Sequence, residues 1–404
     1  MRGRCTVLTV VSILASADPP LPPGDSRAGY EATTYRTQSR NLDGAGTALD
    51  LVALTKQPPL GLPPVPAETE PPTPASVALG RKLFVDRRLS ANGTLSCAMC
   101  HIPEQGFTHN ELATPVGIEG RDVKRNAPAL YNVVYRSALF HDGRESSLVQ
   151  QVWSPLLAEN EMGNASQADV VARIAAAEDY REPFGAAFDG APTAENVGRA
   201  LAAYERSLLS ADSPFDRFRF GGDANALDAT ARAGLALFVA KGCSACHTIG
   251  ERNALFTDDG FHDTGIGYYA AKRGKGVSRM QVAPGVVIDV SSDLTAPDAN
   301  DLGRFEATHA DVDRWKYRTP TLRNVALTAP YMHDGSLPTL AAVIDYYDRG
   351  GTPHPGQDAR IVPLGLAAEE RTALTAFLDA LTGSNVAALA RDARSAAIGD
   401  VHSP

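Results

Sequence analysis

This sequence has little strand-like alternation of polar and apolar residues, no long apolar run near its start and fewer basic than acidic residues. No stretch alternates polar and apolar residues convincingly over the length of a strand, so we predict a mainly α fold. The apolar run near the start, Cys5–Ala15, is too short to cross a bilayer. Basic residues are fewer than acidic ones, 38 against 47, and the resulting formal charge of −9 argues against nucleic acid as a partner.

The first 17 residues have the pattern of a secretory signal. Arg2 and Arg4 give a basic start, an apolar run follows, and small residues end at Ala17. A buried N-terminal strand is the alternative, but a proline-rich segment follows at once. We therefore expect cleavage after Ala17, which removes Cys5. Because the segment carries two arginines and no acid, cleavage changes the formal charge from −9 to −11.

Cysteine is also scarce, and four of the five cysteines fall in two copies of one motif. Residues 97–101 read CAMCH and residues 243–247 read CSACH. C-x-x-C-H attaches c-type haem: each thiol adds to one vinyl group, and the histidine binds the iron. The spacing is strict because three side chains must reach one rigid macrocycle. We predict two haem c groups, attached at Cys97, Cys100, Cys243 and Cys246 and bound through iron to His101 and His247.

Paired cysteines have two other common uses. Zinc would need both C-x-x-C pairs to close one tetrahedron, which would leave His101 and His247 idle. A thioredoxin-like redox site would need a βαβ context that neither copy has. If all four remaining cysteines carry haem, no disulfide can form. Covalent haem and export together predict the bacterial periplasm.

Length and repetition suggest the domain organisation. A chain of 404 residues is long enough for two or three domains, and two haem motifs favour two haem domains. Each motif follows a helical stretch ending in Leu-Phe, at Ala75–Asp86 and Asp228–Ala240, which indicates an internal duplication. We predict a proline-rich, partly mobile arm at 18–73, haem domains at 74–215 and 216–383, and a loose tail at 384–404. Further helices are expected at 146–158, 169–177, 194–209, 337–347 and 367–381.

Other short motifs lie between and after the haem motifs. They are RNAP at 125–128, DGR at 142–144, EMG at 161–163, TPTLRN at 319–324 and APYMHDG at 329–335, together with Gln151 and Pro155. As a set, over residues 74–383, the chain resembles the bacterial di-haem cytochrome c peroxidases and their MauG-like relatives. The resemblance implies two cytochrome c-like domains with long irregular loops. It also implies reduction of hydrogen peroxide to water.

The resemblance makes the N-terminal haem, at His101, the peroxidatic one. Gln151 and Glu161 match the distal-pocket residues of the family. A carboxylate there can take a proton from peroxide and return it to the leaving oxygen. We expect burial to raise its pKa. Without the resemblance, Glu161 would be read as an ordinary surface or helix-end acid.

One departure from the peroxidase pattern concerns access to the first haem. In the resting peroxidases a loop histidine, placed directly after a glycine, blocks the open iron position. Here Gly117 is followed by Ile118, which cannot bind iron. His109 is out of register and is expected on a surface loop. We therefore predict a five-coordinate, accessible haem at His101, as in MauG-like enzymes.

A second departure concerns the sixth ligand of the haem at His247. The peroxidases use a methionine in the helix after the His-Asp-Gly motif, and MauG-like enzymes use a tyrosine. The alignment places Tyr347 there, and a phenolate stabilises ferric and higher states. Tyr346, Met332 and Met280 are the alternatives. Without the resemblance, Tyr347 would be a core aromatic residue.

Two further sites follow from the resemblance. Where the family usually has a tryptophan between the haems, this chain has His141, which is harder to oxidise but can hydrogen-bond a haem propionate. Trp153 and Trp315, the two tryptophans, suit packing better than a radical route. Asn126, Thr328 and Pro330 match the calcium site of the family, and oxygen ligands suit Ca²⁺.

Three functions remain open from the sequence. The first is peroxide reduction with electrons from a small cytochrome or cupredoxin, relayed through the second haem. The second is a MauG-like oxidation of side chains on a partner protein. The third is electron transfer without catalysis, which requires six-coordinate iron at both haems. A basic electron-transfer partner would suit the acidic chain, although solubility also explains the charge.

Overall fold

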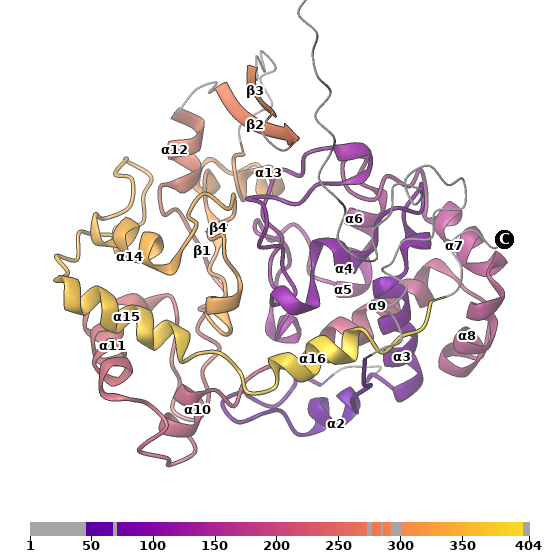
Figure 1. The fold of residues 1–404 in the computed structure, drawn as a ribbon, viewed down its shortest axis with the longest axis horizontal. Helices are drawn as coiled ribbons and strands as arrows, with labels where there is room; N and C mark the ends of the chain where they lie inside the picture. The colour runs from indigo at the N-terminus through magenta and orange to yellow at the C-terminus, as the bar shows by residue number, and fades with distance from the viewer. Residues whose placement is uncertain (1–45, 68–70, 273–276, 284–285, 292–300, 399–404) are drawn as a thin grey trace, which may run out of the picture. The chain divides into compact units, whose positions relative to one another are not determined.

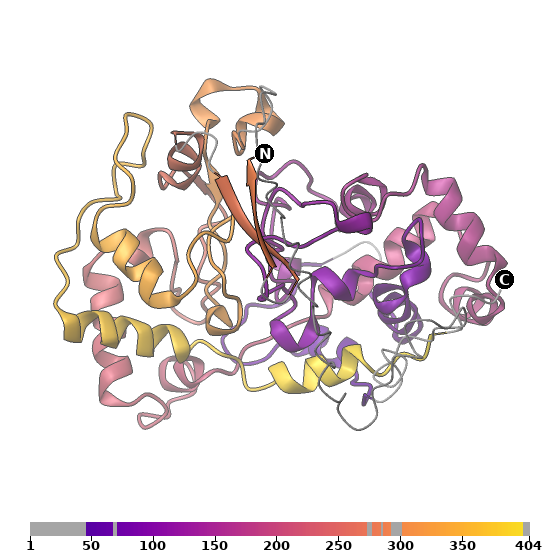
Figure 2. The same ribbon diagram turned by 45° about the horizontal axis from the view of Figure 1, so that its top comes forward.

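The structure, a computed structural model, is mainly helical (Figures 1 and 2), and the predicted fold class is confirmed. It describes the chain except residues 1–45, 68–70, 273–276, 284–285, 292–300 and 399–404, so the expected signal segment and the first part of the arm lie outside it. The α-helices are α2 (Leu51–Lys56), α3 (Pro74–Val85), α4 (Cys97–Cys100), α5 (Leu148–Gln151), α6 (Trp153–Leu157), α7 (Gln167–Ala176), α8 (Arg181–Phe188), α9 (Ala194–Arg206), α10 (Pro214–Arg219), α11 (Ala229–Ala240), α12 (Ile266–Lys272), α13 (Phe305–Thr308), α14 (Leu340–Asp348), α15 (Ala368–Asp379) and α16 (Val386–Ala393).

The described strands form two small antiparallel sheets. β1 (Phe261–His262) pairs with β4 (Tyr317–Arg318), and β2 (Val277–Ala283) pairs with β3 (Val286–Ser291). The β2–β3 hairpin was not predicted, because no convincing alternation of polar and apolar residues marks these strands in the sequence. The helix predicted at 146–158 is divided into α5 and α6.

Two helix pairs form the framework of the fold. α3 packs against α9, and α11 packs against α15, as Figure 1 shows for the second pair. In each pair a glycine lets the two backbones meet: Gly80 lies against the carbonyl of Ala200, and Gly234 against that of Ala373. A Cβ atom at either glycine would overlap the facing backbone. The same close crossing therefore occurs twice.

The duplication extends beyond these helices. Asn132 and Asn324 both adopt left-handed backbone angles, with φ of 62° and 61°. Their amides donate to Leu208 and Leu381, which follow α9 and α15. A His-Asp-Gly sequence follows each turn, at 141–143 and at 333–335. Each half thus repeats a helix, a haem motif, an asparagine turn, a His-Asp-Gly loop and a closing helix.

The apolar core consists of two main clusters of buried side chains. One draws on α2, α3, α7 and α9, and includes Phe84 and Phe107. The other draws on α11, α14 and α15, and includes Phe238 and Phe377. Helix starts are set by local side-chain caps, at Thr73, Thr193, Asp228 and Thr339. The first haem motif comes after α3 in the chain, and the second comes after α11.

Two segments expected to be loose are folded. Leu51 of α2, in the second part of the proline-rich arm, is buried. In the expected tail, α16 buries Leu389 and Asp392, and Asp392 forms an ion pair of 2.8 Å with Arg81 of α3. The structure corrects the loose-tail expectation for residues 386–393, because this pair joins positions 311 apart that no local pattern connects.

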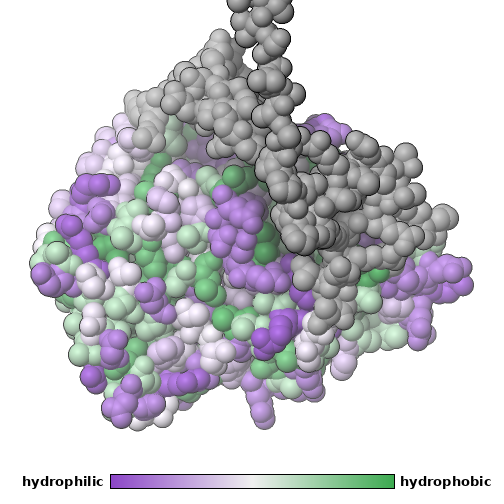
Figure 3. Space-filling model, in the orientation of Figure 1, coloured by the Kyte–Doolittle hydropathy of each residue, from purple (hydrophilic) through white to green (hydrophobic). Residues whose placement is uncertain are grey.

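The surface is mixed in polarity. On the part of one face that Figure 3 colours, hydrophilic and hydrophobic side chains are interspersed. Within the described residues, no helix is both long enough and apolar enough to cross a membrane.

The glycine crossings generate a stability prediction. Gly80→Ala should lower the free energy of unfolding by about 1–3 kcal/mol, because overpacking forces α3 and α9 apart. Gly185→Ala is the matched control, since Gly185 lies in α8 with open space around its Cβ position. It should raise stability by up to about 1 kcal/mol. Urea denaturation measures both, and equal effects would contradict the close-crossing interpretation.

Candidate active site

The same kind of hydrogen bond, to a backbone carbonyl, orients both motif histidines. The Nδ1 of His101 lies 3.1 Å from the carbonyl oxygen of Phe107, and the Nδ1 of His247 lies 2.9 Å from that of Phe256. Both phenylalanines have left-handed backbone angles, with φ of 55° and 52°, which turn these carbonyls toward the rings. With the proton on Nδ1, each Nε2 lone pair is available to a metal.

The charge state of the first histidine also suits iron binding. Burial lowers the pKa of His101 to about 4, so its imidazole is neutral at pH 7. Burial also lowers the pKa of His247. A neutral imidazole with an oriented Nε2 is the form that binds iron.

The four motif cysteines are separate thiols in the structure. None forms a disulfide, and the four do not gather into one metal-binding group among the described residues. Burial raises the pKa of Cys100 and of Cys243 to about 11, so both are neutral thiols. This arrangement argues against the zinc alternative and leaves each pair free for haem.

A buried positive charge supports the fit of haem to the site. Arg136 and Arg318 line a common cavity with Asn132, Tyr135 and Thr257. Burial and the neighbouring Arg318 lower the pKa of Arg136 to about 10. Asp259 pairs with one terminal nitrogen of Arg318. The Nε and the other terminal nitrogen of Arg318 have no hydrogen-bond partner among the described residues. Because two guanidinium groups share one carboxylate, a positive charge is left over, and a further anion can bind there. Haem carries two propionates, which are anions of this kind.

Glu161 lies at the first motif. Its negative charge acts on the Cys100 thiol, which places the carboxyl group close to that cysteine. Burial raises the pKa of Glu161 above its usual range, although the positive charge of Arg144 opposes the shift. Arg144 is itself paired with Asp142 at 3.0 Å. The expected raised pKa of this acid is therefore present, and its cause is desolvation.

Ile118 lies against the turn that carries Glu161. Its amide donates to the Glu161 carbonyl at 2.9 Å, and its buried side chain lies against Gly163. An aliphatic side chain thus occupies the place where a loop histidine would be expected. His109 is buried rather than on a surface loop, and its Nδ1 accepts a hydrogen bond from the Leu112 amide. The sequence expectation for His109 was wrong on this point.

Gln151 and Pro155 stand on the two short helices before this turn. Gln151 ends α5, is partly buried, and makes no side-chain hydrogen bond to any described residue. The Pro155 carbonyl, in α6, accepts from the Met162 amide at 3.1 Å. The helices and the Glu161 turn thus form one connected unit. Trp153, in α6, is part of the core, as expected for a packing role.

The second motif has a tyrosine beside it. Burial is the main cause of the raised pKa of Tyr347, and the charge of Tyr346 is the next. The charges of Cys246 and Cys243 raise it further, so this phenol lies near both thiols. Tyr346 instead donates its hydroxyl to the Thr264 carbonyl at 2.7 Å. Met332 lies in the turn before His333, and the side chain of Met280 lies outside the described residues. The geometry favours Tyr347 over Tyr346 as the ligand.

His141 and His333, one from each half, both form a hydrogen bond with Asn126. The Asn126 carbonyl oxygen lies 2.9 Å from the Nε2 of His141, and the Asn126 amide donates to the His333 carbonyl at 2.7 Å. Burial lowers the pKa of His141 to about 4. Asn126 also donates its side-chain amide to Ala113, which leaves its Oδ1 as a possible ligand. Calcium at Asn126, Thr328 and Pro330 stays a prediction.

Residues that the sequence analysis did not single out complete this region. Arg125 pairs with Asp142 of its own half and with Asp301 of the other, each at 2.6 Å. Arg136 and Arg318 supply the buried charge described above. Of these three arginines, only Arg125 lies in one of the sequence motifs, RNAP. Arg136 follows a 3₁₀ turn and Arg318 lies in β4, and neither belongs to a recognisable motif.

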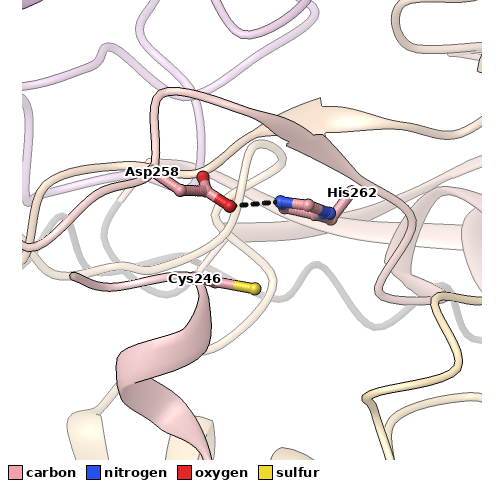
Figure 4. Close-up of side chains that lie close together, drawn as sticks. All are labelled: Cys246, Asp258 and His262. Carbon is pink, nitrogen blue, oxygen red and sulfur yellow. Dashed lines mark hydrogen bonds and ion pairs between the residues drawn. The ribbon is translucent and has the colours of Figure 1, made fainter.

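One further cluster adjoins the second motif (Figure 4). His262 lies 2.8 Å from Asp258 and 2.9 Å from Asp358, and the Cys246 thiol is nearby. The Cys246 thiol first, and then Asp258, raise the pKa of His262 to about 9. Because haem attachment would consume this thiol, we interpret the cluster as part of the haem surroundings rather than as a separate metal site.

Comparison with known proteins agrees with this geometry. Residues 74–225 match the family described as di-haem cytochrome c peroxidase, and residues 316–351 match a RoxA-like, cytochrome c-like family. The chain is 37% identical to the methylamine utilization protein MauG of Methylorubrum extorquens, over 78% of this chain and 80% of that protein. The chain belongs to the di-haem cytochrome c peroxidase and MauG family.

Family members that are named for different functions match this chain about equally. The cytochrome-c peroxidase IdrP1 of a Pseudomonas species is 35% identical over 81% of this chain and 86% of its own length. The crystal structure of a MauG-like protein associated with microbial copper homeostasis has 32% identity and a TM-score of 0.67, covering 82% of this chain and 96% of that one. This chain is therefore an oxidoreductase of the peroxidase type, and its family implies haem c as the cofactor.

The ligand assignment can be tested with a matched pair of variants. Tyr347→Phe should remove one axial ligand from the second haem and convert it to a high-spin form. Tyr346→Phe should leave the spectrum unchanged, because that hydroxyl bonds to Thr264. Low-temperature electron paramagnetic resonance of the ferric protein measures both. A change in the second variant alone would make Tyr346 the ligand.

Proposed function

We propose that this protein is a periplasmic di-haem peroxidase that reduces hydrogen peroxide to water without prior reductive activation. The observation that carries the proposal is Ile118, which lies on the Glu161 turn where a blocking histidine would be expected. The periplasmic location rests on the signal pattern of residues 1–17 and on covalent haem. Electrons would come from an external donor, a small cytochrome or cupredoxin, through the second haem.

The residues present fit two haem c groups. Cys97 and Cys100 would hold the first and Cys243 and Cys246 the second, with His101, His247 and Tyr347 toward the irons. Arg136 and Arg318 would neutralise propionates. Bound there, haem would supply the redox-active iron and an open position for peroxide. We also propose calcium at Asn126, Thr328 and Pro330, where it would brace the Asn126 contact between the halves.

Glu161 would move the proton in this reaction. Its buried carboxylate would accept the proton from one peroxide oxygen and deliver it to the other, which leaves as water. Arg144 would limit the rise of its pKa, so that a fraction is ionised and able to accept a proton. Gln151, whose amide has no other described partner, would orient peroxide by a hydrogen bond.

A second candidate function is oxidation of side chains on a partner protein. Three observations favour it: Ile118 stands in place of the blocking histidine, as in MauG-like enzymes, Tyr347 lies beside the second motif, and MauG is among the relatives of about one-third identity. His141 favours the first function, because a histidine is harder to oxidise than a tryptophan. Electron transfer without catalysis is disfavoured by the buried acid at the first motif.

Rapid mixing of the untreated ferric protein with stoichiometric peroxide tests the accessible site. The wild type should react at once. Ile118→His should give a low-spin first haem that reacts only after reduction. Val116→His is the control, because Val116 is exposed two residues away. A wild type that reacts only after reduction would overturn the proposal, whereas a long-lived oxidised species without a donor would favour the second function.

Replacement of the acid tests its proton-transfer role. Glu161→Gln should lower kcat/KM for peroxide by about 10²–10⁴-fold, the usual contribution of a general acid–base residue. The wild-type rate should rise with pH through the raised pKa of Glu161, since only its carboxylate accepts a proton. In the variant this rise of the rate with pH should be absent. Glu159→Gln, at an exposed neighbouring position, should behave as wild type in steady-state assays.

A further inference from the structure

A second buried acid lies beside the first haem motif. Glu205 is in the last turn of α9 and is only 7% exposed. Its carboxyl group makes no hydrogen bond or ion pair with any described residue. A carboxyl group buried without a partner is costly to ionise. Nothing in the mechanism above uses it.

Glu205 and Glu161 lie near different thiols of the same motif. The charge of Glu205 acts on Cys97, and that of Glu161 acts on Cys100. Thioether bonds attach haem along one edge of the macrocycle, whereas the propionates leave from the opposite edge. Glu205 therefore lies on the thioether side. Glu205 therefore does not pair with a propionate. The positive charges that would pair with the propionates are those of Arg136 and Arg318.

The surroundings of Glu205 disfavour its ionised form. Burial raises its pKa to about 8, although the charge of the neighbouring Arg206 opposes the shift. On α3, which packs against α9, Arg81 is neutralised by Asp392. After the 3₁₀ turn Val133–Tyr135, which also packs against α9, Arg136 donates to the Ala129 carbonyl. On α4, Cys97 loses its titratable thiol when haem attaches.

We propose that Glu205 is a positioning residue that couples reduction of the first haem to the uptake of one proton. At a pH where Glu205 is ionised in the ferric protein, one electron from the donor takes the iron from ferric to ferrous, and one proton from water converts the Glu205 carboxylate to the acid. No other bond forms or breaks. A nearby carboxylate favours ferric over ferrous iron by Coulomb attraction, so reduction raises the proton affinity of Glu205. This inference rests on the haem content of the proposed function.

Potentiometric titration of the first haem at several pH values tests the coupling in the full-length holoprotein. In the wild type the potential should fall as pH rises through the ionisation of Glu205. Each tenfold difference in its acid dissociation constant between the two redox states contributes about 59 mV. In Glu205→Gln, which is neutral throughout, this step should be absent and the potential should stay at the low-pH value.

Two controls separate this step from other titrations. Glu195→Gln changes an exposed acid on the same helix and should keep the wild-type pH dependence. Glu161→Gln removes the acid beside Cys100 and should keep the step that belongs to Glu205. If Glu205→Gln retains the wild-type slope, the inference is overturned.

A second measurement covers the case in which Glu205→Gln does not fold. Glu205→Asp keeps a carboxyl group and should move the pH step rather than abolish it. Redox-difference infrared spectra of the wild type should show a protonated carboxyl stretch that appears on reduction; its absence would also overturn the inference. The potential and the peroxide reaction are measured separately. A protein with the step but no peroxide turnover would overturn only the proposed function, and turnover without the step would overturn only this inference.

Discussion

The hydrogen bonds from the two motif histidines to the carbonyls of Phe107 and Phe256 are the contacts on which the site depends. They fix the direction of each imidazole, but they require left-handed backbone angles that bulky residues disfavour, at a cost of order 1–3 kcal/mol each. Packing offsets that cost. Both rings are fully buried, and each contacts another ring edge-on, Phe107 with Tyr131 at 5.2 Å and Phe256 with Phe215 at 5.0 Å.

Because these phenylalanines belong to the two core clusters, the haem sites and the cores are one structure. In each half the motif follows α3 or α11, and the glycine crossing brings the closing helix against that helix. The phenylalanine carbonyl then orients the motif histidine. A change in either helix pair is therefore transmitted to a histidine through packed side chains rather than through a flexible loop.

Buried charge stabilises the second half and its contact with the first. Within the second half, the fully buried side chains of Arg323 and Asp216 pair at 2.9 Å. Between the halves, Arg125 joins Asp142 to Asp301. Arg136 and Arg318 share one carboxylate, that of Asp259. Since buried charges without a partner are expensive, we predict that haem propionates balance the remaining positive charge and so stabilise this region.

Relatives named for peroxidase activity and for methylamine utilization match this chain at similar identity. The shared framework alone therefore does not decide between the two kinds of function. We predict that the side chains of Ile118, Tyr347 and His141 decide it in this chain.

The sequence by itself determined the haem motifs, the mainly α class, the helix starts and the family, because these depend on spacing and local periodicity. It also indicated the duplicated helices, through the Leu-Phe pair at the end of each helical stretch. Only the tertiary structure decided the matching asparagine turns, the burial of α16 through Arg81 and Asp392, the charge at Arg136 and Arg318, and the isolation of Glu205. These depend on which distant groups share a low-dielectric interior, and burial is a property of the whole fold that no local pattern encodes.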